Sequence, residues 1–359
     1  MSGEGRGTGV AIASGDRAVV TGAAGFIGSA VVRALLLRGV RVVALIEPGG
    51  DDQNLHGLDV ERITVDVRDR DAIADACRQA RFIFHLAAMY RFWAPRPKDF
   101  YDVNVGGVLN MLDAARRNDC ERVIYTSTVG VLGLDGAAHG EAADETCYAD
   151  VAHLFGLYKR TKYVAEHEVL RAAAQGVPVS LVLPTFPIGP GDNRPTPTGK
   201  LVLDFLNGRI PAYVDTTLNV VHVDDLATGH LLALEHGSVG RSYIVGGENM
   251  GMGSFLGALA QATNLPAPKW QVPRSVALSV GALSQLVEAR MLKREPFAAL
   301  EAARMSTTNM MFDDKRARHE LGYTSRPASA AMDDSARWFA ENGYVTPKRL
   351  RRMKFGGVG

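Results

Sequence analysis

Tyr158 and Lys162 are four positions apart in a stretch with a helical pattern, so their side chains share one face of the helix. A free phenol has a pKa of about 10 and is a poor base near neutrality. A neighbouring ammonium favours the phenolate. Such a pair can move a proton to or from a substrate oxygen while hydride moves to or from carbon. The same spacing also describes an ordinary surface tyrosine and lysine, so the pattern needs support from the rest of the chain.

Glycines 22, 25 and 28 form the second pattern, because they lie between an apolar run that ends at Thr21 and a helical pattern. A side chain at position 22 or 25 would hold a phosphate away from the backbone, and the first N–H groups of the helix point at that phosphate. Gly28 would let the helix pack closely on the strand. The sequence therefore predicts a dinucleotide site rather than a turn that merely needs glycine. The expected contacts are Gly22, Ala24, Gly25, Phe26, Ile27 and Gly28. A nicotinamide ring is positive when oxidised and would further favour the Tyr158 phenolate.

Composition limits the class of protein and its partners. The 359 residues fit one large or two modest domains, and a hydrophobic content of 47% can bury a substantial core. The net charge of +1 gives no electrostatic reason to expect a nucleic-acid partner. Cysteines 77, 120 and 147 share no metal-ligand spacing, so we expect no metal site and free thiols in a reducing, cytoplasmic compartment. No apolar run approaches the roughly 20 residues of a membrane span, and we expect residues 1–16 to be a disordered leader.

Strand and helix patterns alternate along the first half of the chain. The near-continuous apolar run at 81–86 is typical of a parallel strand that is covered on both faces. The expected strands are 41–46, 63–67, 81–86, 121–127 and 177–183, and the expected helices are 69–79, 99–118 and about 155–175. This alternation predicts an α/β fold, a Rossmann-like doubly wound parallel sheet.

A shift in composition after Pro184 marks a second unit. Five prolines and three glycines at 184–199 predict a long irregular loop over the strand ends, where ligands bind in such sheets. We expect later strands at 220–223 and 241–245, with a helix at 225–236 between them. The predicted domains are a dinucleotide-binding domain of 17–184 plus about 220–249, a smaller and mainly helical substrate domain of about 185–219 plus 250–330, and a C-terminal helix with a basic tail at 331–359.

Motifs in one order along almost the whole chain resemble the extended short-chain dehydrogenase/reductase family. They are 21–28 (Thr-Gly-Ala-Ala-Gly-Phe-Ile-Gly), 85–88 (His-Leu-Ala-Ala), 104–107 (Asn-Val-Gly-Gly), 125–128 (Tyr-Thr-Ser-Thr), Tyr158 with Lys162, and 222–225 (His-Val-Asp-Asp). Within that family, segments 187–199 and 204–215 are most similar to hopanoid-associated sugar epimerases, a branch close to dihydroflavonol reductases. "Epimerase" is there a family label more than a mechanism.

The resemblance implies catalytic roles residue by residue. Tyr158 would be the general acid and base, and Lys162 would hold the nicotinamide ribose and bias the tyrosine. Thr128 would hydrogen-bond the reacting oxygen, with Ser127 as the neighbouring alternative. Asn104 would be a structural or water-holding residue, or else a cap at the start of a helix.

The resemblance also implies the remaining cofactor contacts. Asp66 would meet the adenine amine, unless it is only a turn residue at the strand end. Ala87 and Ala88 would line the cofactor, because the backbone must come close there. His85 lies within an apolar strand, so we expect a satisfied core histidine rather than a catalyst. The other expected contacts are Val67, Leu86 and Pro184.

Glu47 follows the second strand about 20 positions beyond Gly28, the spacing at which a carboxylate accepts hydrogen bonds from the adenosine ribose. A 2′-phosphate there would meet like charge, so we expect NAD as the cofactor and NADP as the weaker alternative. The side chain of Arg68 or Arg41 could still reach such a phosphate. Glu47 could also simply solvate a turn before Pro48.

Two positions depart from the sugar-nucleotide epimerases of the family. Those enzymes hold the substrate diphosphate with an Asn after the sixth strand and an Arg before the His-Val-Asp-Asp stretch, where Phe186 and Leu218 stand here. Arginine is suited to gripping phosphates, so we expect a carbonyl or alcohol on an apolar body, with a sugar as the alternative substrate. Arg194 or Lys200 could replace the missing arginine. The expected apolar residues near the substrate are Phe92, Trp93, Phe186 and Phe205.

Residues 272–291 could form an amphipathic helix with basic ends, and 348–354 form a basic tail. Peripheral membrane contact would suit a lipid substrate, but we favour a helix packed on the core and a solvated tail. The resemblance implies a homodimer built through a helical pair. A rival function is a non-catalytic regulator that senses dinucleotides, but such proteins commonly lack the Tyr–Lys pair. Dehydratases tend to carry Asp-Glu where Val129 and Gly130 stand, so we expect an oxidoreductase or epimerase.

Overall fold

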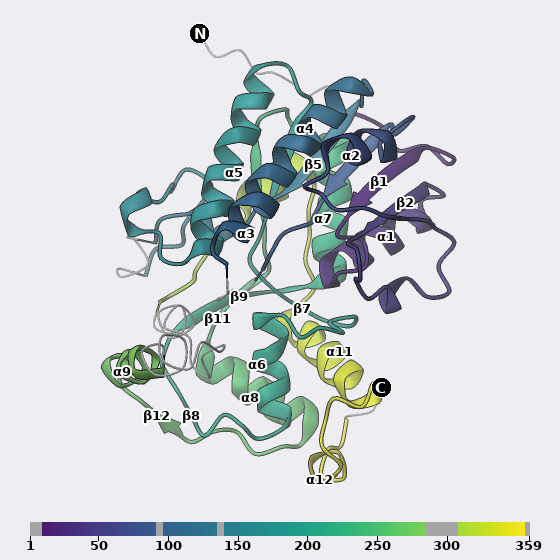
Figure 1. Ribbon diagram of the computed structural model, residues 1–359. Helices are drawn as coiled ribbons and strands as arrows, with labels where there is room; N and C mark the ends of the chain where they lie inside the picture. The colour runs from purple at the N-terminus through teal and green to yellow at the C-terminus, as the bar shows by residue number, and fades with distance from the viewer. Residues whose placement is uncertain (1–8, 91–95, 135–139, 285–307, 356–359) are drawn as a thin grey trace.

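The computed structural model describes residues 9–90, 96–134, 140–284 and 308–355 (Figure 1). A seven-stranded parallel sheet forms the centre of the larger unit, with the strand order β10-β6-β5-β4-β1-β2-β3. Its strands are β1 (Arg17–Thr21), β2 (Arg41–Ile46), β3 (Glu61–Thr64), β4 (Phe82–His85), β5 (Arg122–Thr126), β6 (Val179–Pro184) and β10 (Ser242–Val245). The chain order reverses between β1 and β4, which creates the crevice where ligands bind in doubly wound sheets. The predicted Rossmann-like fold is confirmed.

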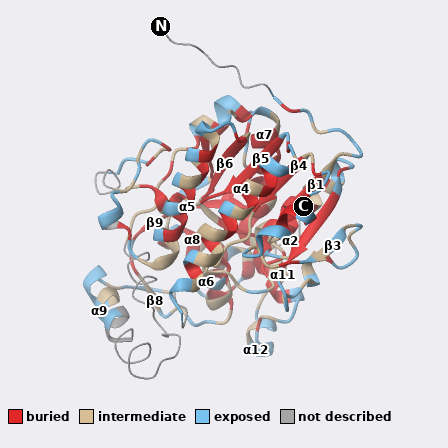
Figure 2. Cartoon of the chain, turned by 45° about the horizontal axis from the view of Figure 1, so that its top comes forward, coloured by how far each residue is buried: buried red, intermediate tan, exposed pale blue. Residues whose placement is uncertain are grey.

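Helices cover both faces of this sheet. On one face lie α1 (Phe26–Leu37) and α7 (Val223–His236), and on the other lie α2 (Arg70–Ala76), α4 (Gly107–Arg117) and α5 (Leu157–Ala174). Val19 packs with the second group of helices and Val20 with the first, as alternating side chains on a strand require. Both residues are fully buried, and buried residues dominate the sheet in Figure 2.

The smaller unit lies below the sheet in Figure 1 and has its own core. The strands β7 (Phe186–Ile188), β9 (Thr217–His222) and β11 (Glu248–Gly251) form a three-stranded sheet against α6 (Pro197–Leu206), α8 (Met252–Thr263) and α11 (Ala328–Glu341). The predicted irregular loop at 184–199 is therefore wrong at both ends. β7 pairs with β9, and Thr196 caps α6 by accepting a hydrogen bond from the Gly199 N–H at 3.3 Å.

Residues 9–16 and the segment around α12 pack on the core more closely than expected. Residues 9–16 pack on the larger unit, because Val10 is buried and its N–H donates to the Glu235 carbonyl at 3.1 Å. The prediction of a disordered leader is thus wrong for these residues. After α11, α12 (Pro347–Leu350) brings Arg349 against α6, where its guanidinium donates to the Leu206 carbonyl at 2.8 Å. The basic tail is therefore partly bound to the core rather than wholly solvated.

Several expected boundaries also shift. β3 ends at Thr64, so Val67 lies beyond the strand. The helix expected at 99–118 comprises α3 (Lys98–Tyr101), a π-helical segment (Asp102–Gly106) and α4. A short strand pair, β8 (Ala212–Tyr213) with β12 (Trp270–Gln271), precedes α9 (Arg274–Ser284). The amphipathic helix expected at 272–291 therefore begins at Arg274, and its residues 285–291 lie outside the described residues. None of the helices in the described parts of the chain combines the length and apolar character that crossing a membrane requires.

Candidate active site

The glycine turn is packed from two sides at the β1–β4 crevice. Gly22 has a φ of +65°, and a Cβ atom there would lie 2.9 Å from the Ala87 amide nitrogen. A Cβ atom at Gly28 would lie 2.0 Å from the Gly22 carbonyl oxygen, so the close approach that Gly28 permits is to the turn itself. The Thr21 hydroxyl accepts hydrogen bonds from the Leu86 and Ala87 N–H groups, both at 3.1 Å. The turn and the end of β4 are therefore held together as one cradle.

The start of α1 suits the phosphates of a dinucleotide. Gly25 occupies the cap position with no side-chain hydrogen bond, and the first turn carries no acidic residue. The N–H groups at Phe26, Ile27 and Gly28 precede the intrahelical ladder and carry the positive end of the helix dipole. A pyrophosphate placed here would satisfy these groups without displacing a side chain.

His85 lies in the core, as expected, but its ring is not the fully satisfied one that was predicted. Its Nδ1 is hydrogen-bonded to the Thr21 hydroxyl at 3.0 Å, and its Nε2 is buried with no partner in the described structure. Burial, followed by the charge of Lys162, lowers the pKa of His85 to about 3. The ring is therefore neutral at physiological pH and stacks near Tyr125, with 6.0 Å between ring centroids.

Helix α5 places Tyr158 and Lys162 on one face, as the four-residue spacing predicts. Tyr158 is half-buried, and its ring centroid lies 4.7 Å from that of Tyr90, an aromatic residue that the sequence reasoning did not single out. Lys162 is only 3% exposed, donates to the Thr126 carbonyl at 2.6 Å and lies 4.3 Å from the Tyr125 ring centroid. Burial lowers the pKa of Lys162 to about 7, and the nearby Glu166 opposes that change.

Glu166 is a buried carboxylate that the sequence reasoning missed, although its position four residues after Lys162 was a signal. Its carboxylate accepts hydrogen bonds from the Ser127 hydroxyl and, at 3.2 Å, from the Tyr148 hydroxyl. Ser127 is buried and its hydroxyl is committed to Glu166, so its expected role as an alternative to Thr128 is not supported. Thr128 is half-buried, and its hydroxyl accepts from the Gly130 N–H at 3.1 Å, which leaves its own proton free to donate.

Asn104 lies inside the π-helical segment, so the prediction of a helix-start cap is wrong. Its amide oxygen accepts from the Met89 N–H at 2.7 Å, and its amide nitrogen donates to the Thr161 hydroxyl at 2.9 Å. Thr161 directly precedes Lys162 on α5. Asn104 therefore ties the loop after β4 to the helix that carries Tyr158, which agrees with a structural role.

The expected adenosine end of the site holds two ion pairs. Glu47 is 75% exposed in its side chain, and its carboxylate lies 3.5 Å from Nη1 of Arg194, which comes from the loop after β7. Asp66 accepts from the N–H and the guanidinium of Arg68, both at 2.9 Å, and these hydrogen bonds lower the pKa of Asp66. Asp66 thus makes the turn contact that is its alternative role. Arg41 donates to the Gly15 carbonyl at the far end of β2, so it does not lie near Glu47.

Two further expected cofactor contacts, Val67 and Pro184, lie next to the ends of strands of the large sheet. Val67 lies beyond β3, where its carbonyl accepts from the Asn110 amide at 2.9 Å. Pro184 ends β6 and pairs in register with Val245, and the next residue, Thr185, has a buried hydroxyl oxygen with no partner in the described structure. Thr185 is a further polar group at the strand ends that the sequence reasoning did not identify.

The two positions of the missing diphosphate clamp lie in an apolar cluster. Leu218 is buried, and Phe186 packs edge-to-face on Phe255 with 6.0 Å between ring centroids. Lys200 pairs with Asp204 at 2.5 Å, and Arg194 is the partner of Glu47. Neither replacement cation is therefore placed at the clamp position.

The other three aromatic residues expected near the substrate have different outcomes. Phe205 is 2% exposed in the core of the smaller unit, so it is not a pocket wall. Phe92 and Trp93 lie outside the described residues.

Comparison with known proteins places the chain in a family. Residues 18–246 match the model of the NAD dependent epimerase/dehydratase family. The chain is 39% identical over 338 residues to a putative dihydroflavonol 4-reductase of Synechocystis sp., covering 93% of this chain and 97% of that protein. It is 34% identical over 328 residues to sterol demethylase protein B of Methylococcus capsulatus, covering 91% and 99%. It also matches the crystal structure of gox2253 with 41% identity and a TM-score of 0.82, covering 92% and 100%.

Proposed function

The chain belongs to the NAD-dependent epimerase/dehydratase family and is an NAD-dependent enzyme; we propose that its substrate is a secondary alcohol or ketone. The proposed reaction moves hydride between the nicotinamide C4 and the carbon of a secondary alcohol or ketone on a mainly apolar body. The main support for this proposal is the apolar cluster at Phe186 and Leu218, where a diphosphate clamp would need polar side chains. A diphosphate there would lose its water without regaining hydrogen bonds, which is costly.

In this mechanism the bound cofactor supplies or accepts the hydride. Tyr158 holds the proton that moves to the substrate oxygen during reduction, and takes it back during oxidation. Lys162, buried beneath it on the same helix face, holds positive charge near the phenol. Thr128 donates a hydrogen bond to the same substrate oxygen and so orients the carbonyl. The buried position of Lys162 excludes water from this charge and strengthens its effect.

The relatives' names support an apolar substrate. They denote sterol and dihydroflavonol chemistry, and both proteins cover more than nine tenths of this chain. Hopanoid-associated sugar epimerisation is the second candidate, favoured by the likeness of segments 187–199 and 204–215. The presence of Thr128 together with the Tyr158–Lys162 pair argues against a non-catalytic, dinucleotide-sensing regulator.

A two-part assay tests the proposal. Apolar ketones, including 3-ketosteroids, are offered with NADH, and nucleotide sugars such as UDP-glucose are titrated by calorimetry into protein saturated with NAD. We expect turnover of an apolar ketone and no micromolar binding of nucleotide sugars. Micromolar binding of UDP-glucose that falls sharply in Arg194→Ala would show a clamp at another place and return the assignment to a sugar-nucleotide epimerase.

A further inference from the structure

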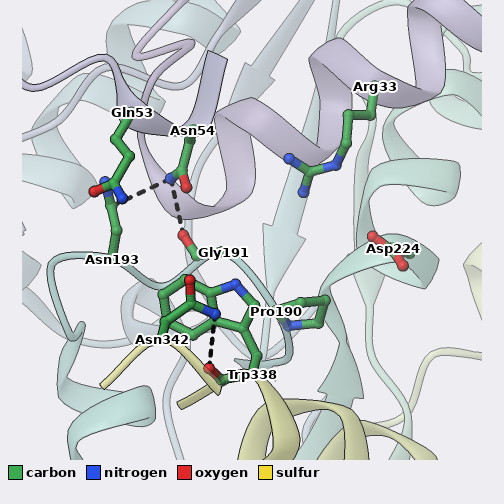
Figure 3. A pocket seen from close by; sticks show the side chains of 9 residues that line it. All are labelled: Arg33, Gln53, Asn54, Pro190, Gly191, Asn193, Asp224, Trp338 and Asn342. Atoms are coloured by element: carbon green, nitrogen blue, oxygen red, sulfur yellow. Dashed lines mark hydrogen bonds between the residues drawn. The ribbon is translucent and has the colours of Figure 1, made fainter. Parts of the chain in front are cut away.

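A pocket lies between the two units, on the face of the sheet covered by α1 and α7 (Figure 3). Its volume is about 350 Å³. Residues from α1, α7, α11, the turn after β7 and the segment after β2 line it, namely Arg33, Gln53, Asn54, Pro190, Gly191, Asn193, Asp224, Trp338 and Asn342. We call this the interdomain pocket. Most of its lining residues are polar, and it includes one basic and one acidic side chain.

Arg33 is half-buried at this pocket without a direct partner. No hydrogen bond or ion pair joins its guanidinium to any residue in the described parts of the chain, and the opposite charge that acts on it is Asp224. Burial lowers the pKa of Arg33, and the Asp224 carboxylate opposes this effect. A guanidinium carries five N–H donors, and leaving them unpaired in a partly desolvated place is unfavourable. An anion in this pocket would find guanidinium donors that no side chain in the described parts of the chain uses.

Gly191 opens the space between Arg33 and Asn54. A Cβ atom at Gly191 would lie 3.6 Å from Nη2 of Arg33 and 3.8 Å from Oδ1 of Asn54, so both groups border the same volume. The Asn54 amide nitrogen is already used, since it donates to the Gly191 carbonyl at 2.8 Å and to the Ala24 carbonyl at 3.1 Å. Its Oδ1 is the atom that remains as an acceptor. Gly191 also has a φ of +92°, which favours glycine there.

Asp224 and Trp338 supply the other recognition chemistry. Asp224 lies in the first turn of α7, and its side chain is 47% exposed, so its carboxylate can accept hydrogen bonds from hydroxyl groups. Trp338 of α11 is held by stacking on Tyr344, with 5.4 Å between ring centroids, and gives the pocket a flat apolar wall. Figure 3 shows Arg33 on one side of the Pro190–Gly191 turn and Trp338 with Asn342 on the other.

The interdomain pocket is distinct from the dinucleotide site. Arg33 lies seven residues beyond Phe26, the first residue of α1, which is about 10 Å along the helix axis. The phosphates of a dinucleotide belong at the start of that helix. Asn54 links the two sites, because its amide donates to the Ala24 carbonyl in the glycine turn.

From these contacts we propose that the interdomain pocket binds a small phosphorylated sugar. The phosphate pairs with Arg33, since a guanidinium matches phosphate oxygens with two parallel hydrogen bonds. Sugar hydroxyls donate to Asp224 and to Oδ1 of Asn54, and one apolar face of the ring rests on Trp338. The volume lies at the lower end of the range for small-ligand sites, which fits one sugar ring with its phosphate.

Calorimetry on the full chain saturated with NAD tests the proposal, with glucose 6-phosphate as the probe. We expect saturable binding, with at least tenfold weaker binding of glucose and of inorganic phosphate. Arg33→Gln should weaken glucose 6-phosphate binding at least tenfold. Arg38→Gln is the matched control, because Arg38 follows the same helix but already pairs with Glu235 at 2.7 Å, and it should bind like the wild type.

A second measurement uses the wild-type protein, so it does not depend on whether Arg33→Gln folds. In wild-type protein labelled with ¹⁵N, the indole N–H signal of Trp338, identified as the signal missing from Trp338→Phe, should move during the titration. The signal of Trp270, which is 75% exposed on β12, should stay in place. No saturable binding up to about 10 mM, an immobile Trp338 signal, equal binding by Arg33→Gln, or equal binding of phosphate alone would each overturn the proposal.

Discussion

The hydroxyl of Ser127, at the end of β5, donates a hydrogen bond to the carboxylate of Glu166, one helical turn beyond Lys162 on α5. Burial raises the pKa of Glu166, and the hydrogen bonds from Ser127 and Tyr148 oppose that rise. The same carboxylate raises the pKa of Lys162 and so opposes the lowering that burial causes. The charge on Lys162 therefore depends on a buried carboxylate outside the expected set of catalytic residues.

Glu166→Gln should change the pH profile of the enzyme. Removing a carboxylate near a buried ammonium lowers the pKa of that ammonium, so Lys162 would lose its proton at lower pH. We expect the alkaline fall in kcat/KM to move down by about one pH unit. Tyr148 and Ser127 donate hydrogen bonds to Glu166, and Lys162 and His167 act on it as cations, so none of these groups can replace its negative charge.

Glu168→Gln on the same helix is the control for Glu166→Gln, because Glu168 pairs only with Arg171 in the described structure. Its pH profile should match the wild type. A Glu166→Gln enzyme that loses activity equally at every pH would mean that Glu166 only supports the fold.

The enzyme should bind NAD more tightly than NADP, and Arg194 should moderate that preference. Glu47 repels a 2′-phosphate, while the guanidinium 3.5 Å away partly neutralises Glu47. Arg194→Ala should therefore weaken NADP binding several-fold more than NAD binding, a difference of about 1 kcal/mol for an exposed pair. Calorimetry with both cofactors measures it, with Arg209→Ala as a control whose guanidinium pairs with Asp204 instead. Tighter binding of NADP to the wild type would contradict the role given to Glu47.

Acid should destabilise the fold through buried His230. Its Nδ1 donates to the Leu226 carbonyl at 2.8 Å and its Nε2 accepts from the Thr126 hydroxyl at 2.9 Å, so the neutral ring is fully satisfied. Burial lowers the pKa of His230 to about 4 in the folded chain, below the value of about 6.5 expected when unfolded. Between those values only the unfolded chain takes up the proton, so the free energy of unfolding falls as the pH drops through this window.

Urea unfolding at about pH 7 and pH 5 measures this effect. His230→Gln should lose about 2 kcal/mol less than the wild type between the two conditions. His56→Gln, at an exposed histidine beside Asp52, should behave like the wild type. Equal losses in all three proteins would place the acid sensitivity at other groups.

Local patterns predicted the parts of this molecule that depend on residues close in sequence. The alternation of strands and helices, the glycine turn and the shared face of Tyr158 and Lys162 all follow from periodicity over one or a few helical turns. β7 lies beyond the reach of such patterns, since it has only three residues and its strand geometry depends on pairing with the distant β9.

Contacts between distant residues could not be predicted from the sequence. The bond between Ser127 and Glu166 and the pair of Arg194 with Glu47 join residues from different elements, and their polar side chains suit many other roles. Asn104 was interpreted as a possible helix cap because a π-helical segment within a continuous helix leaves no mark in the hydrophobic pattern. The composition of residues 9–16 predicts disorder. In the structure, however, the Val10 side chain is buried and its N–H donates to the Glu235 carbonyl, and neither contact leaves a signal in the composition.

The central claim is that Tyr158 is the acid and base in a hydride transfer, and isotope labelling tests it most directly. NADH labelled with deuterium at the nicotinamide C4 is mixed with the apolar ketone that the substrate assay identifies, and mass spectrometry measures the deuterium in the product. The wild type should place deuterium on the carbinol carbon. Tyr158→Phe should slow this transfer by about 10²–10⁴-fold, while NAD affinity stays within a few-fold because the ring can still pack against Tyr90. Tyr163→Phe, on the same helix beside His167, should react like the wild type. A Tyr158→Phe enzyme that keeps more than about half of the wild-type rate would contradict the assignment of Tyr158 as the acid and base.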